Sequence, residues 1–120
     1  ENIEDKDPSH RVDLVKSFDS TSMRVSIDTG HAHYAHGSTG APPVDRYVGA
    51  AGELLAHIHL QDADGYADRH WAPGDGTIRW TSIFKAVATL KASPRLILEL
   101  RDHSEILKGA RHLIDLGLAR

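Results

Sequence analysis

The chain of 120 residues has no cysteine, a single methionine and few aromatic residues, which make up 6% of it. Without cysteine there are neither disulfides nor thiolate metal sites, so any metal must be held by His, Asp and Glu. No apolar run approaches the roughly 18 residues needed to cross a bilayer, and no signal-peptide pattern opens the chain. We therefore expect a cytoplasmic protein that does not bind membranes.

The overall composition is typical of a soluble globular protein. Hydrophobic residues make up 40% of the chain and charged residues 26%, and the length allows one domain with a modest core. The net charge of −3 counts only weakly against nucleic acid, since a basic patch could still exist locally. Nine histidines raise the expectation of metal or proton chemistry.

Helical and strand patterns alternate along the chain, which is typical of an α/β fold with a parallel sheet. Between them lie two long polar loops, Gly30 to Pro43 and Gln61 to Gly76. The predicted strands are Met23 to Asp28, Ala56 to Leu60 and Arg95 to Leu100, and Glu1 to Ile3 is the stub of an earlier strand. The predicted helices begin at Pro8, span Val44 to Leu55 and Trp80 to Ala92, and run from Asp102 to Gly117.

Each predicted strand ends in a side chain that can bind a metal. Asp28, His59 and Glu99 lie at or near the C-terminal ends of the three strands, the end where parallel α/β folds place their active sites. Burying unpaired carboxylates costs several kcal/mol or more, so these residues need a cation or other partners. The pattern therefore predicts a metal site at this edge of the sheet.

Five stretches of the sequence together resemble a known family. They are Glu1-Asn2-Ile3, Asp28-Thr29-Gly30-His31, His59-Leu60-Gln61-Asp62, Asp68-Arg69-His70 through Gly76, and Leu98-Glu99. In order, spacing and strand context they resemble the second half of a xylose isomerase-like TIM barrel, over nearly the whole chain. That superfamily holds sugar and sugar-phosphate isomerases and epimerases as well as endonuclease IV-type apurinic endonucleases. The resemblance implies one partial domain over residues 1–120, about half of a (β/α)8 barrel: strands six to eight and the end of strand five.

The resemblance also implies a set of site residues. Glu1, Asp28, His59 and Glu99 match the metal ligands shared by the isomerase and epimerase branch. Three carboxylates and one imidazole suit Mn²⁺, Mg²⁺ or Co²⁺ at least as well as Zn²⁺. The leading hypothesis is isomerisation or epimerisation of a small sugar or sugar phosphate through an enediolate, with Glu1 and Glu99 moving the proton as the catalytic pair.

For residues in the two long loops, the resemblance implies functions that differ between the isomerase branch and the endonuclease branch. His31 would bind a substrate oxygen, or a further metal in the endonuclease branch. Asp68 and His70 look like additional metal ligands of the endonuclease, and Arg69 could contact an anion or a hydroxyl. The sequence departs from the endonuclease at Gly30 and has an acidic rather than glycine-rich stretch after its first residue.

Two rival readings follow. One is metal-dependent hydrolysis of abasic DNA. Several tightly bound Zn²⁺ ions would favour this hypothesis, whereas one Mn²⁺ or Mg²⁺ would favour the isomerase. The other is a non-catalytic barrel remnant, or a fragment that is inactive alone. Four of eight strands cannot close a barrel, and open parallel edges tend to pair, so we expect self-association or a missing N-terminal half.

Three further residues have structural roles by expectation. Asp62 orients His59 or caps the loop that follows. His57 is an interior imidazole one layer below the site. Trp80 packs in the core or at its rim.

Overall fold

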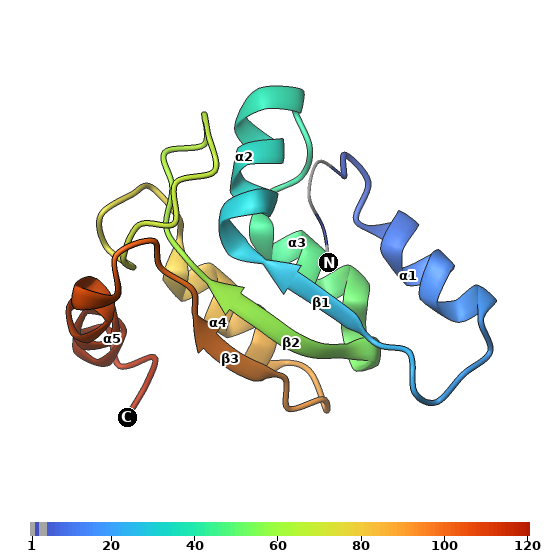
Figure 1. The fold of residues 1–120 in the computed structure, drawn as a ribbon. Helices are drawn as coiled ribbons and strands as arrows, with labels where there is room; N and C mark the ends of the chain where they lie inside the picture. Colours follow the sequence, from blue (N-terminus) through green and yellow to red (C-terminus); the bar gives the residue numbers. More distant parts are fainter. Residues whose placement is uncertain (1, 3–4) are drawn as a thin grey trace.

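The computed structural model describes residue 2 and residues 5–120, in which strands and helices alternate along the chain (Figure 1). Its sheet has three parallel strands in the order β1 (Val25–Asp28), β2 (Leu55–Leu60) and β3 (Arg95–Leu98). The prediction of an α/β fold with a parallel sheet is confirmed. The expected strand stub at Glu1 to Ile3 falls, apart from Asn2, outside the described residues.

The helices lie around this sheet. Figure 1 shows α3 and α4 behind the sheet, α1 beside β1 and α5 beside β3, while α2 rises from the end of β1. The helices are α1 (Ser9–Ser17), α2 (Thr29–Thr39), α3 (Val44–Ala51), α4 (Trp80–Ala88) and α5 (Ile106–Asp115), with short 3-10 turns at Gly52–Leu54 and His103–Glu105. None of the helices in the described part of the chain has the length and apolarity that crossing a membrane requires.

The predicted loop from Gly30 to Pro43 is wrong, because most of it forms helix α2. The side chain of Asp28 accepts a hydrogen bond from the amide of His31 and so caps the first turn of this helix. Ala32 and Ala35 bury small side chains against the rest of the fold, and Gly40 ends the helix in the left-handed conformation, with φ 73°. The small, polar composition of the segment concealed a helix that depends on its cap and its packing.

The core lies between the sheet and the helices behind it. Ile27 of β1 and Ile58 of β2 are 2% and 0% exposed, and Tyr47 and Val48 of α3 pack in the same cluster. On β3, Leu98 packs against this cluster, but Leu96, which shares its face, is 39% exposed. Leu96 is less covered because β3 is an edge strand of the described sheet.

Asp62 organises the long loop between β2 and α4. Its Oδ1 accepts hydrogen bonds from the amides of Ala63 and Ile78, at 2.9 and 3.1 Å. Its Oδ2 accepts from the amide of Gly74 at 2.8 Å and from the indole Nε1 of Trp80 at 2.9 Å. Of the two roles expected for Asp62, the structure supports the capping of the loop, and Trp80 is buried as predicted.

Candidate metal centre

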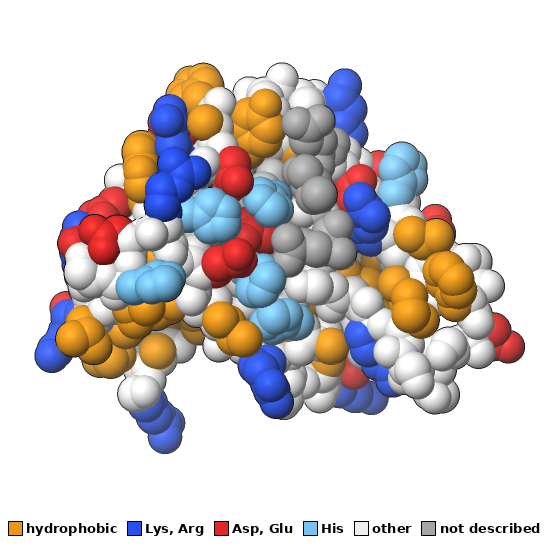
Figure 2. Space-filling model, in the orientation of Figure 1, with side chains coloured by type: hydrophobic (Ala, Val, Ile, Leu, Met, Phe, Trp, Pro, Cys, Tyr) orange, Lys and Arg blue, Asp and Glu red, His pale blue; other side chains and the backbone are white. Residues whose placement is uncertain are grey.

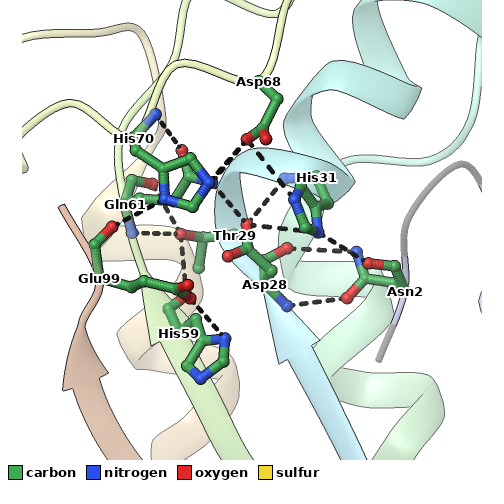
Figure 3. A network of polar contacts seen from close by, with 9 residues as sticks. All are labelled: Asn2, Asp28, Thr29, His31, His59, Gln61, Asp68, His70 and Glu99. Carbon is green, nitrogen blue, oxygen red and sulfur yellow. Dashed lines mark hydrogen bonds and ion pairs between the residues drawn. The ribbon is translucent and has the colours of Figure 1, made fainter. Parts of the chain in front are cut away.

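Asp28, His59 and Glu99, which we call the first ligand group, lie side by side at the C-terminal ends of the three strands (Figure 3). Asp28 and His59 are register partners on β1 and β2. The amide of Glu99 donates to the carbonyl of Leu60 at 3.1 Å, which extends the pairing of β2 and the chain beyond β3 by one step. One possible ligand atom from each of the three lies within 4.8 Å of the others. The sheet itself therefore brings the predicted ligands together.

Asp28 is held from several sides. It is fully buried, at 0% exposed, and its Oδ1 accepts hydrogen bonds from the amide of His31 at 2.8 Å and from Nε2 of Gln61 at 3.1 Å. The side chain of Asn2 pairs with the backbone of Asp28, donating to its carbonyl at 3.2 Å and accepting from its amide at 2.8 Å. Both donors, the backbone amide of His31 and the side-chain amide of Gln61, reach the same carboxylate oxygen and fix the orientation of this buried carboxylate.

A second ligand group, His31, Asp68 and His70, lies beside the first, and its ligand atoms also lie within 4.8 Å of one another. Oδ1 of Asp68 is 3.5 Å from Nε2 of His31 and 3.2 Å from Nε2 of His70. Burial raises the pKa of Asp68, but the hydrogen bond from Gln61 and the neighbouring His70 and His31 outweigh it, so the pKa lies below its ordinary value. Asp68 is thus an anion suited to binding a cation.

His70 has an unusual backbone, with φ 54°, in the left-handed region that residues other than glycine rarely adopt. Three hydrogen-bonding contacts hold it there. Its amide donates to Oε1 of Gln61 at 2.7 Å, its carbonyl accepts from the amide of Arg101 at 3.1 Å, and its Nδ1 lies 3.1 Å from the carbonyl oxygen of Glu99. Such strain persists where the surroundings impose it, and it often accompanies a functional role.

Figure 2 shows the result on the surface: His, Asp and Glu side chains gather at the centre of one face. The structure describes both ligand groups there, but Glu1, the fourth predicted ligand, lies outside the described residues, so its two roles stay predictions. His57 lies next to the site, with its ring 4.5 Å from that of His59.

Arg69 has other contacts. Its Nε and Nη2 donate to Oδ2 of Asp64 at 3.1 and 2.8 Å, and its guanidinium lies 5.3 Å from the centre of the Trp71 ring. Its ion pair is thus with Asp64, which belongs to neither ligand group. Its contact with a substrate anion or hydroxyl stays a prediction.

Three residues that build the centre were not singled out from the sequence: Asn2, Thr29 and Gln61. The hydroxyl of Thr29 donates to the carbonyl of Gln61 at 2.7 Å and accepts from its amide at 3.0 Å, so that the ends of β1 and β2 are joined. Gln61 is 0% exposed. In the sequence Gln61 is marked only by its place directly after a predicted strand, and nothing there indicates its burial or its partners.

The donor set of both groups fits a divalent cation. The first ligand group offers two carboxylates and one imidazole, and the second offers one carboxylate and two imidazoles. Oxygen-rich sets suit Mn²⁺, Mg²⁺ and Co²⁺, and sets with more imidazole suit Zn²⁺. The chemistry of the residues present is therefore compatible with one cation or with two.

Comparison with known proteins relates the chain to sugar epimerases. It is 31% identical over 88 residues to D-psicose 3-epimerase of Ruminiclostridium cellulolyticum, a match that covers 73% of this chain and 27% of the relative. An uncharacterised protein of Methanocaldococcus jannaschii is 23% identical over 102 residues, which cover 85% of this chain and 34% of that protein. A shorter segment of 36 residues, 30% of this chain, is 44% identical to 13% of fructoselysine 3-epimerase of Escherichia coli O157:H7. The chain thus spans about a third of these relatives or less.

The fold and the family agree. The crystal structure of a D-tagatose 3-epimerase-like protein superimposes with a TM-score of 0.76 at 21% identity, over 95% of this chain and 44% of that one. This overlap confirms the prediction of a partial barrel. The family described as xylose isomerase-like TIM barrel matches residues 1–118. The chain therefore belongs to the xylose isomerase-like TIM barrel family.

Proposed function

We propose that the chain carries the C-terminal half of the active site of a metal-dependent sugar or sugar-phosphate isomerase or epimerase. The observation that carries the proposal is the first ligand group, Asp28, His59 and Glu99, on the ends of three neighbouring strands. The named relatives act on D-psicose and fructoselysine, which favours a small hydroxy-ketone sugar as substrate. Since three strands cannot close a barrel, we expect no turnover from this chain alone.

The residues of the chain divide the proposed chemistry among them. Asp28, His59 and Glu99, with Glu1, would hold the cation, which when bound would acidify the C–H beside a substrate carbonyl and so favour an enediolate. The carboxylate of Glu99, which is 45% exposed at this face, would take up that proton; Glu1 is the proposed partner that returns a proton. His31, whose side chain is 16% exposed, would bind a substrate oxygen.

The test of this proposal separates binding of the cation from binding of the sugar. Mn²⁺ is titrated into the full chain and followed through the relaxation rate of the water protons. D-psicose is then added, with sorbitol, a polyol without a carbonyl group, as the matched control. We expect one tightly bound Mn²⁺, whose effect on water relaxation D-psicose lowers and sorbitol does not. Absence of Mn²⁺ binding, or equal effects of the two compounds, would contradict the proposal.

A second candidate function is metal-dependent hydrolysis of abasic DNA, and the second ligand group favours it. His31, Asp68 and His70 could hold a further cation beside the first, as hydrolases with two or more metals require. Equilibrium dialysis followed by elemental analysis distinguishes the candidates. Two or more tightly bound Zn²⁺ ions, together with retention of abasic duplex DNA over intact duplex, would favour the hydrolase; a single Mn²⁺ or Mg²⁺ without DNA binding would favour the isomerase.

A further inference from the structure

Gln61 lies between the two ligand groups and touches members of both (Figure 3). It is the only glutamine of the chain, follows directly after β2 and is fully buried. Its Nε2 donates to Oδ1 of Asp28 at 3.1 Å and to Oδ1 of Asp68 at 3.0 Å. Its Oε1 accepts from the amide of His70 at 2.7 Å. One side chain thus contacts one carboxylate of each group and the backbone of a third ligand.

These partners allow only one orientation of the Gln61 amide. The backbone N–H of His70 can only donate, so the oxygen of the amide must face it. The ionised carboxylates of Asp28 and Asp68 can only accept, so both hydrogens of the amide must face them. The opposite orientation would set the amide oxygen against two carboxylates and its NH₂ against an N–H.

The position of Gln61 is fixed as well as its orientation. Its backbone amide and carbonyl are both bonded to the hydroxyl of Thr29. Its side chain fills the space beside Gly30, where a Cβ atom would lie 2.3 Å from Cδ and from Oε1 of Gln61. A distance below 3 Å is not possible without movement, so glycine at position 30 is what leaves room for the amide.

We propose that Gln61 is a positioning residue shared by the two ligand groups, so that the carboxylates of Asp28 and Asp68 and the strained backbone of His70 are aligned together by one amide. The cation-binding part of this inference rests on the proposed function. Partners of this kind, which orient metal ligands without touching the metal, typically change metal affinity by about 10- to 100-fold when replaced.

The first experiment needs no metal. Because the chain has one glutamine and one asparagine, its side-chain amide signals in a ¹⁵N-correlated NMR spectrum are few and can be assigned with Gln61→Met. We expect two well-separated Gln61 amide protons that exchange slowly with water, since both are buried and bonded. Rapidly exchanging protons at ordinary positions would overturn the inference, whether or not the chain binds a metal.

The second experiment measures each group alone. Asp68→Asn leaves the first ligand group intact, and Asp28→Asn leaves the second; each asparagine retains an oxygen that can accept from Gln61. Adding Gln61→Met to either background should weaken the remaining group about 10-fold, measured with Mn²⁺ for the first group and Zn²⁺ for the second. A loss in only one background, or in neither, would overturn the shared role. If Asp68→Asn, in which the first ligand group is intact, binds no Mn²⁺, the proposed function fails while the NMR result still decides the role of Gln61. If Asp28→Asn binds no Zn²⁺, the second group does not hold a cation and the shared role in cation binding is overturned.

Substitution of Gly30 provides an independent test of the same contact. Gly30→Ala should weaken both groups as Gln61→Met does, because the new methyl group displaces the amide. In a Gln61→Ala background, where the amide is gone, Gly30→Ala should add less than a twofold change. Gly49→Ala, which meets nothing within 4 Å, is the control and should leave both affinities unchanged. Circular dichroism of each variant checks that the fold persists, and additive effects of the two substitutions would contradict the assigned contact.

Discussion

Nδ1 of His59 lies 2.7 Å from Oε2 of Glu99, so an imidazole of the middle strand is in direct contact with a carboxylate that follows the edge strand. This contact depends on the register of β2 and β3, which pairs His59 with Ile97 and lets the chain run two residues further to Glu99. The two side chains can therefore share a hydrogen bond or ligate one cation, but the two uses compete for the same atoms.

Glu99→Gln should weaken Mn²⁺ binding to the chain at least about 10-fold, because a neutral amide is a poor metal ligand. Replacing a residue that merely orients a ligand already weakens metal binding by about this factor. The measurement is a titration of free Mn²⁺ by electron paramagnetic resonance. Glu53→Gln is the matched control, since Glu53 lies before β2, at the opposite end of the sheet, where it accepts from the amide of Lys91. Equal affinities of the two variants would contradict a role of Glu99 as ligand.

Asp62→Asn should lower the free energy of unfolding by about 3 kcal/mol. The substitution removes the charge that accepts four hydrogen bonds and turns an NH₂ group toward N–H donors in a buried place. Urea unfolding followed by circular dichroism measures the loss. The exposed Asp13→Asn should change stability by less than about 0.5 kcal/mol. If the two variants were equally stable, Asp62 would not be what anchors the loop.

Two glycines should respond in opposite ways to alanine. At Gly74, φ is 100° and a Cβ atom would lie 2.7 Å from Nδ1 of His112, so Gly74→Ala should destabilise the fold by about 1 kcal/mol or more. Gly49 lies on an exposed face of α3 with nothing within 4 Å of the added atom, so Gly49→Ala should stabilise it by about 0.5–1 kcal/mol. Thermal unfolding of both variants and of the parent chain shows whether each substitution raises or lowers the stability.

His33 should make the fold sensitive to mild acid. Burial lowers the pKa of His33 from 6.5, although the charge of Asp62 opposes this, and Nε2 of His33 lies 2.7 Å from the hydroxyl of Thr77. As the pH falls, the unfolded chain therefore binds a proton at His33 before the folded chain does. The contribution of neutral His33 to the free energy of unfolding is present above pH 6.5 and is lost as the pH falls below it.

The measurement is urea unfolding at a series of pH values between about 5 and 7. His33→Gln keeps a polar partner for Thr77 but cannot titrate, so its stability should fall less steeply with acid than that of the parent chain. Identical slopes for the two proteins would show that His33 does not contribute.

The strands and their terminal ligands could be predicted because both depend on local patterns. Asp28 and His59 each follow a short β-branched or Leu-rich run, and parallel pairing then sets such residues beside one another whatever lies between them. Helix α2 could not be predicted in this way. Its first turn is capped by a residue that also ends a strand, and Ala32 and Ala35 stabilise it only through contacts with distant parts of the chain.

The polar supports of the site were equally out of reach. Asn2 pairs with the backbone of Asp28, far along the chain. Gln61 has its role through hydrogen bonds to Asp28, which precedes it, and to Asp68, which follows it. A pattern of residue types along the sequence carries no information on which buried amide will face which carboxylate. Only the packed structure fixes these pairs.

Asp28 belongs to two structures at once, because the carboxylate that could bind a cation also caps α2 through the amide of His31. The proton on that amide is therefore a built-in reporter. If a cation draws the carboxylate into a more rigid position, this one amide proton should exchange with deuterium more slowly than before, while amides in the middle of α3 keep their rates. Occupancy of the centre can thus be followed at a single backbone position, without substrate and without a spectroscopically active metal.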